Sequence, residues 1–199
     1  MRRFLNAAGM IVLVISVFAW NFGEGLFVWG SRAYQYLTYK EPSTLTLVSV
    51  DTFIGMCLNA QYRADDHVAF AETMGWQPLD DAIVAMMRPP APQEFYKGWV
   101  AYPPDFPTFS FFAFAGRSAD SETPQVETCG AFFRSIQGTE FTDEFVRQTR
   151  ASLAYSDQTF AGLQRGYTIP DLPNVIVSIG LPGLEETDVM AYAIYPIAN

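Results

Sequence analysis

The stretch "VETCGAFFRSI" at residues 126–136 decides the architecture of the chain, because it places a cysteine in a segment rich in β-branched and aromatic residues. In an extended segment successive side chains point to opposite faces of a sheet, so Cys129, Ala131 and Phe133 share one face. The other face carries the remaining alternate positions, Thr128, Gly130, Phe132 and Arg134. We therefore predict a β-strand whose Cys129 face meets the core.

The second cysteine, Cys57, lies in "DTFIGMCLNA" (51–60), where apolar residues recur with helical spacing. Either Ser49 or Asp51 can cap the first turn, so we expect a helix that begins there and turns Cys57 toward the core. In an oxidising compartment an even pair of cysteines most simply forms one disulfide, Cys57–Cys129. The bond would hold a helix on a sheet.

Two short helices are expected next along the chain. Asp65 and Asp66 are typical first-turn acids of a helix that runs to Met74 and stops at Gly75. Residues 79–88 form a second short helix, capped by Asp80.

Most of the remaining body reads as strand, because β-branched and aromatic residues are bounded by Gly, Pro, Asp and Ser. The expected strands, besides 126–136, are 98–102, 108–116, 160–169, 174–180 and 189–197. One helix interrupts them; Thr142 caps it, and Phe141, Phe145, Thr149 and Leu153 repeat every four residues along it. The predicted class is α+β, with an antiparallel sheet of about six strands and three to four helices. No internal repeat is visible.

The N-terminal region, residues 1–30, reads as a signal anchor or a signal peptide. Arg2 and Arg3 precede the uncharged stretch "AAGMIVLVISVFAW" (7–20), so the N-terminus stays in the cytoplasm and the body is exported. In the first alternative the segment is an uncleaved single-pass anchor, followed by an aromatic juxtamembrane segment (31–48) and an extracytoplasmic domain (49–199). In the second, cleavage after Ala19 releases a soluble chain.

The charge of the chain limits its partners. The formal net charge is −9, and residues 1–40 hold four basic residues against one acidic residue, so the acidic excess lies in the body. An acidic surface repels phosphate backbones, which argues against nucleic-acid binding.

Catalytic motifs are missing from the sequence, and we favour a non-enzymatic protein without cofactor or metal. No nucleophile elbow, phosphate-binding loop or zinc-protease motif is present. His67 is the only histidine, and as a first-turn residue we expect it to be exposed or half-exposed. The adjacent Asp65, Asp66 and His67 fan out by about 100° per residue and do not converge on one ion.

Three short motifs resemble uncharacterised exported proteins of Gram-negative bacteria: "FIGMCLNA" (53–60), "TMGWQP" (73–78) and "CGAFF" (129–133). The resemblance covers residues 50–136. It implies a periplasmic setting and carries no assigned activity or catalytic residues.

Two functions are compatible with these features. The first is a contact role, as an accessory or assembly subunit of an envelope complex in the bacterial inner membrane. A stripe suited to packing against a membrane-protein partner supports it, namely Leu26, Gly30, Ala33 and Leu37. The alternative is a periplasmic ligand-binding or hydrolytic domain that uses an aromatic surface and an arginine, namely Tyr96, Trp99, Tyr102, Phe106 and Arg165.

Overall fold

The structure is a computed structural model that describes residues 41–88, 92–103, 109–119, 125–159, 162–182 and 187–197. Pro42–Asn199 forms a compact unit of its own. The expected anchor or signal segment, 1–30, lies outside the described residues, as does most of 31–48. Among the residues described, no helix combines the length and the apolar character that crossing a bilayer requires.

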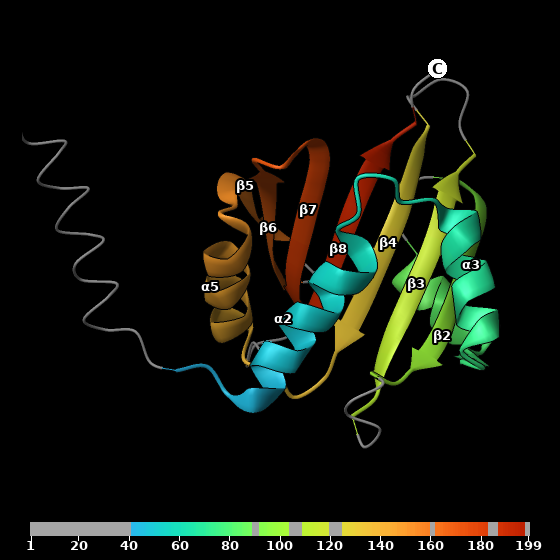
Figure 1. The fold of residues 1–199 in the computed structure, drawn as a ribbon, viewed down its shortest axis with the longest axis horizontal. Helices are drawn as coiled ribbons and strands as arrows, with labels where there is room; N and C mark the ends of the chain where they lie inside the picture. Colours follow the sequence, from blue (N-terminus) through green and yellow to red (C-terminus); the bar gives the residue numbers. More distant parts are fainter. Residues whose placement is uncertain are drawn as a thin grey trace, which may run out of the picture. The chain divides into compact units, whose positions relative to one another are not determined.

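Within the described residues, eight strands form one antiparallel sheet in the order β1-β2-β3-β4-β8-β7-β6-β5 (Figure 1). The α+β class and the antiparallel sheet are confirmed, with eight strands where about six were expected. The strands are β1 (Gln77–Pro78), β2 (Gln93–Ala101), β3 (Phe111–Ser118), β4 (Val126–Phe133), β5 (Ser152–Thr159), β6 (Gly162–Ile169), β7 (Leu172–Pro182) and β8 (Val189–Pro196).

The strand order consists of two halves that meet where β4 pairs with β8. In each half four consecutive strands form a meander, β1 to β4 and β5 to β8. A long helix precedes each meander, α2 (Thr44–Cys57) in the first half and α5 (Gly138–Thr149) in the second. The first half adds α3 (Ala64–Thr73) and α4 (Asp81–Met87). The two halves thus share the order of a long helix followed by four strands. Their amino-acid sequences are not similar, so no repeat is visible in the sequence.

Helix α2 begins earlier than the sequence suggested. Its N-cap is Ser43, whose hydroxyl oxygen accepts a hydrogen bond from the Thr46 backbone N–H at 3.1 Å. The predicted caps Ser49 and Asp51 are therefore wrong, since both lie inside the helix; the Ser49 hydroxyl donates to the Leu45 carbonyl at 2.8 Å. The expected boundary between residues 48 and 49 consequently falls within α2.

The two short helices match their sequence patterns. Helix α3 carries Asp65 and Asp66 in its first turn and gives way to Gly75, whose φ of 65° is a left-handed value that suits glycine. Helix α4 is capped by Asp80, which accepts from the Ala82 N–H at 2.8 Å.

Helix α5 differs from its prediction at both ends. It starts at Gly138 after Gln137, so Thr142 is an interior residue and not the cap. It stops at Thr149 because Arg150 adopts a left-handed conformation, with φ of 56°. Leu153, which the four-residue repeat placed on the helix, instead lies in β5 and is 58% exposed.

The main core lies between one face of the sheet and the helices α2 and α5 (Figure 1). Phe53 of α2 contacts Phe141 and Phe145 of α5 at ring-centroid distances of 6.4 and 6.1 Å. Helix α3 packs beside them on β3, while α4 packs with β2 over the opposite face, where Phe132 and Tyr96 are buried. Cys129 and Phe133 lie in the main core, so the predicted alternation of β4 is confirmed.

A disulfide connects the end of α2 to the middle of β4. It joins Cys57 and Cys129, whose Cα atoms are 5.4 Å apart, across a sequence separation of 72 residues. The hydroxyl of Tyr195 on β8 also donates to the carbonyl of Cys57. The C-terminal end of α2 is therefore fixed to two neighbouring strands.

Candidate functional site

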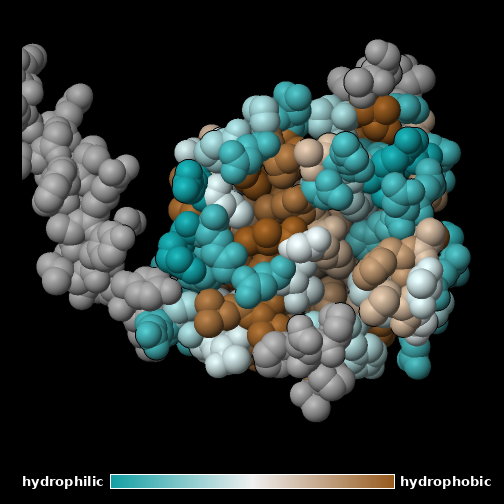
Figure 2. Space-filling view, viewed as in Figure 1, coloured by the Kyte–Doolittle hydropathy of each residue, from teal (hydrophilic) through white to brown (hydrophobic). Residues whose placement is uncertain are grey.

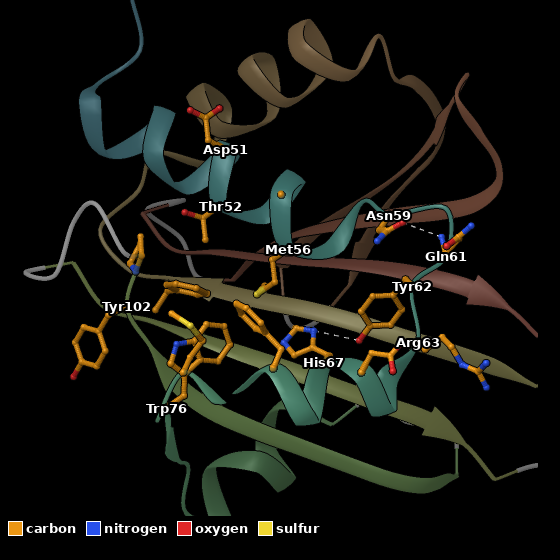
Figure 3. A pocket seen from close by; sticks show the side chains of 16 residues that line it. Asp51, Thr52, Met56, Asn59, Gln61, Tyr62, Arg63, His67, Trp76 and Tyr102 are labelled. Atoms are coloured by element: carbon orange, nitrogen blue, oxygen red, sulfur yellow. Dashed lines mark hydrogen bonds between the residues drawn. The ribbon is translucent and has the colours of Figure 1, made fainter. Parts of the chain in front are cut away.

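A pocket with a volume of about 400 Å³ lies between α2 and α3, above β3 (Figure 3). Half of its lining residues have apolar or aromatic side chains: Met56, Tyr62, Phe70, Met74, Trp76, Tyr102, Pro103 and Phe111. Its charged lining consists of Asp51, Arg63 and Asp66. Figure 2 views the helix-covered face of the domain and shows hydrophobic side chains reaching the surface between the polar outer sides of the helices.

His67 is the buried polar group of this pocket. It lies in the first turn of α3, is 6% exposed and lines the pocket. Its ring stacks on Trp99 at a centroid distance of 5.8 Å and meets Trp76 edge-on at 6.1 Å. The prediction that His67 is exposed is therefore wrong.

The burial of His67 follows from the side of α3 on which it lies. Ala64, His67 and Ala71 are the buried residues of this helix, and their spacing of three and four places them on one face. Alanines on either side of the histidine allow the helix to approach β3 closely, and the imidazole fills the space between. The sequence analysis missed this stripe, although the stripe marks the buried face of α3.

The hydrogen bonds around His67 define its tautomer. The Tyr62 hydroxyl lies 3.2 Å from the Thr128 carbonyl oxygen and 3.4 Å from Nδ1 of His67. A carbonyl oxygen can only accept, so the single hydroxyl proton of Tyr62 is donated to Thr128. Nδ1 must then carry the proton that it shares with the Tyr62 oxygen, which leaves Nε2 of a neutral imidazole as an acceptor.

Nε2 of His67 is buried and has no hydrogen-bond partner among the described residues. In Figure 3 the Nδ1 edge of the ring faces Tyr62, and the other edge is turned toward the side of the pocket where Trp76 lies. A buried acceptor without a partner is uncommon in folded proteins and calls for an explanation.

Burial keeps both members of the His67–Tyr62 pair neutral. Removal from water lowers the pKa of His67 from 6.5 to about 4. Burial, reinforced by the negative charge of Glu127, raises the pKa of Tyr62 above its ordinary value. Neither group carries a charge near neutral pH.

An ion-pair cluster fixes the start of α3 and with it the position of His67. Arg117 on β3 lies 2.6 Å from a carboxylate oxygen of Asp65 on α3 and 2.8 Å from one of Glu127 on β4. These carboxylates raise the pKa of Arg117, the hydrogen bond to Asp65 contributing most. Asp65 is thus anchored to the sheet two residues before His67.

The pocket combines apolar and aromatic walls with polar side chains that can form hydrogen bonds. Both cysteines are in the disulfide, so the pocket contains no free thiol. Across the part of the chain that the structure describes, no three His, Cys, Asp or Glu side chains gather as a metal site would require. The remaining polar lining includes Thr52, Asn59 and Gln61.

The aromatic residues that the sequence suggested as a ligand surface are not brought together. Tyr96 and Trp99 lie on opposite faces of β2, Tyr96 against Phe114 and Trp99 against His67. Tyr102 does line the pocket, whereas Arg165 belongs to β6 and is not part of the lining. Phe106 lies outside the described residues, as do all four positions of the predicted membrane-helix stripe, Leu26, Gly30, Ala33 and Leu37.

Comparison of the chain with family models, curated proteins and solved structures gives no match. The resemblance to exported proteins of Gram-negative bacteria accordingly stays a prediction.

Proposed function

We propose that this domain binds a small, largely apolar molecule in the pocket between α2 and α3. The proposal rests on a pocket of about 400 Å³ that has aromatic side chains in its lining and includes a buried imidazole, whose Nε2 has no partner in the part of the chain that the structure describes. Ligand sites typically measure about 300–1,000 Å³ and combine apolar walls with a few polar groups. This pocket has that size and composition.

The walls of the pocket are held in place by contacts outside it, which supports a preformed site. Tyr62 stacks on Tyr195 of β8 at a centroid distance of 4.9 Å and is hydrogen-bonded to Thr128 of β4. The disulfide holds Cys57, the residue after the lining residue Met56, to β4. A site that is already ordered loses less conformational entropy when it binds a ligand.

We place this function outside the cytoplasm. The disulfide, the acidic body and the basic, then apolar, N-terminus support an exported domain. The chain would remain on the bacterial inner membrane as a single-pass protein, or become soluble in the periplasm after cleavage following Ala19.

A second candidate is the accessory or assembly role in an envelope complex. The observation that favours it is the edge strand β5, which exposes Leu153 (58%) and Tyr155 (43%). Unpaired edge strands with apolar side chains are common docking sites for other chains. A stoichiometric membrane protein that copurifies with the full-length chain from mildly solubilised membranes would support this role, and the small-molecule site is compatible with it.

Binding can be tested with three uncharged probes, 2-naphthol, 2-methoxynaphthalene and octan-1-ol, on the full-length protein in mild detergent. Methyl-labelled methionine NMR reports on the pocket through Met56 and Met74. Met86 on α4 is 75% exposed and is not part of the lining, so it serves as the internal control. Equilibrium dialysis against protein-free detergent gives the free probe concentration.

A pocket-filling variant makes this experiment specific. Gly55 lines the pocket and has open space where a side chain would begin, so Gly55→Phe fills the site without backbone strain. Leu45→Phe adds an aromatic ring on the same helix at an exposed position outside the pocket. We expect saturable shifts of Met56 and Met74 in wild type and Leu45→Phe, and their loss in Gly55→Phe. No binding by any probe, or equal binding by Gly55→Phe, would refute the proposal.

A further inference from the structure

We infer that the ligand of this pocket is an uncharged, flat molecule with an O–H or N–H group that donates a hydrogen bond to Nε2 of His67. The inference rests on the proposed binding function and specifies its ligand class. It follows from the direction of one hydrogen-bond chain and from the aromatic side chains around the ring that ends this chain.

The direction of the chain is fixed at the sheet. The Thr128 carbonyl accepts from Tyr62, and Tyr62 accepts from Nδ1 of His67, with donor–acceptor distances of 3.2 and 3.4 Å. The Thr128 carbonyl can only accept a hydrogen bond, so Tyr62 donates its one hydroxyl proton there and accepts the proton of Nδ1. Nε2 therefore ends the chain as a lone pair, and only a donor can satisfy it.

The sulfur nearest to the imidazole is consistent with this assignment. Sγ of Cys129 lies 3.6 Å from Nδ1 and is bonded to Cys57, so it has no proton to donate. A disulfide sulfur next to Nδ1 can act only as a weak acceptor, which again places the imidazole proton on Nδ1.

The surroundings of Nε2 indicate a flat and apolar ligand body. His67 is backed by Trp99, and Trp76 lies edge-on to it while also meeting Phe70 and Phe111 edge-on. Aromatic walls favour ring-shaped ligands through edge and stacking contacts. Met56 lines the opposite side, on α2, with an adaptable thioether (Figure 3).

The charges at the pocket disfavour an anion. Two carboxylates, on Asp51 and Asp66, and one guanidinium, on Arg63, belong to the lining. Nε2 also has no proton to donate to an anionic group of a ligand. A neutral phenol or an indole-like N–H is the chemistry that this arrangement accepts.

The test compares 2-naphthol with 2-methoxynaphthalene, which have the same ring system but differ in the presence of a hydroxyl donor. The full-length protein is titrated in mild detergent, the methyl signals of Met56 and Met74 are followed, and free probe is measured by dialysis. We expect 2-naphthol to bind about tenfold more tightly, the size expected for one neutral hydrogen bond to a buried acceptor.

Variants of His67 assign the preference to its nitrogen. His67→Leu fills this position with an apolar side chain and removes the acceptor, so the two probes should bind equally. His67→Gln returns an amide oxygen and should restore part of the preference. The wild-type comparison needs no variant, so the inference remains testable if a substitution prevents folding.

The outcomes separate the inference from the function on which it rests. Binding of neither probe refutes the proposed function. Equal binding of both by the wild type, or a preference that persists in His67→Leu, refutes the donor inference and leaves the pocket function intact.

Discussion

Lowering the pH should decrease the free energy of unfolding of the domain, and the contribution of His67 to this decrease can be calculated from its burial. The pKa of His67 falls from 6.5 to about 4 on folding because the imidazole leaves water. Above pH 6.5 the group is neutral in both states and has no effect. Between pH 6.5 and 4 the unfolded chain binds a proton that the folded chain excludes, so the free energy of unfolding decreases as the pH falls. A shift of this size corresponds to about 3 kcal/mol at pH 4.

Urea unfolding of the wild type and of His67→Leu between pH 7 and pH 4 measures this contribution. The 21 acidic residues titrate in the same range, so only the difference between the two proteins isolates the histidine. We expect this difference to shift in favour of the variant by about 3 kcal/mol as the pH falls, with most of the change below pH 6.5.

A second observable checks the cause directly. His67 is the only histidine in the chain, so its ring proton resonances need no further assignment in an NMR titration of the folded protein. A midpoint near 6.5, or a stability difference that stays constant between pH 7 and 4, would refute the burial of the imidazole. The tautomer assignment, and with it the proposed ligand chemistry, would then lose its basis.

Three further predictions concern the framework around the pocket. Replacing Cys57 and Cys129 together by alanine should lower the free energy of unfolding by about 4 kcal/mol, because the bond spans 72 residues; a loss below about 1 kcal/mol in urea would contradict the loop-closure reasoning. Arg117→Met should lower the free energy of unfolding by about 3 kcal/mol, because buried Glu127 loses its ion-pair partner. Adding Glu127→Gln should recover most of that loss in urea unfolding. A double variant no more stable than Arg117→Met would show that the unpaired charge is not the cause. Phe53→Ala should cost about 3–5 kcal/mol by calorimetry, since the ring is fully buried between α2 and α5, and a smaller cost would mean that the two helices close over the cavity.

The sequence predicted the elements whose side chains meet one continuous core. The alternation around Cys129 placed Cys129, Ala131 and Phe133 of β4 on the face of the main core, and helical spacing identified the core face of α2. Residues 152–158 of the edge strand β5 are all exposed, so this strand carries no burial pattern. Its strand conformation comes from pairing with β6, and Leu153 happened to continue the four-residue spacing of the preceding helix.

The failure at His67 has a different cause, and it bears on function. Acidic neighbours and a first-turn position suggested solvent exposure, while the stripe formed by Ala64 and Ala71 showed the opposite. A residue selected for packing alone at this position would be apolar, since an unpaired buried acceptor costs about 1–3 kcal/mol. That cost is removed if a ligand donor meets Nε2. Packing alone does not explain a histidine at position 67, and the same side chain holds a lone pair without a partner among the described residues. Exceptions to local sequence rules are expected at binding sites.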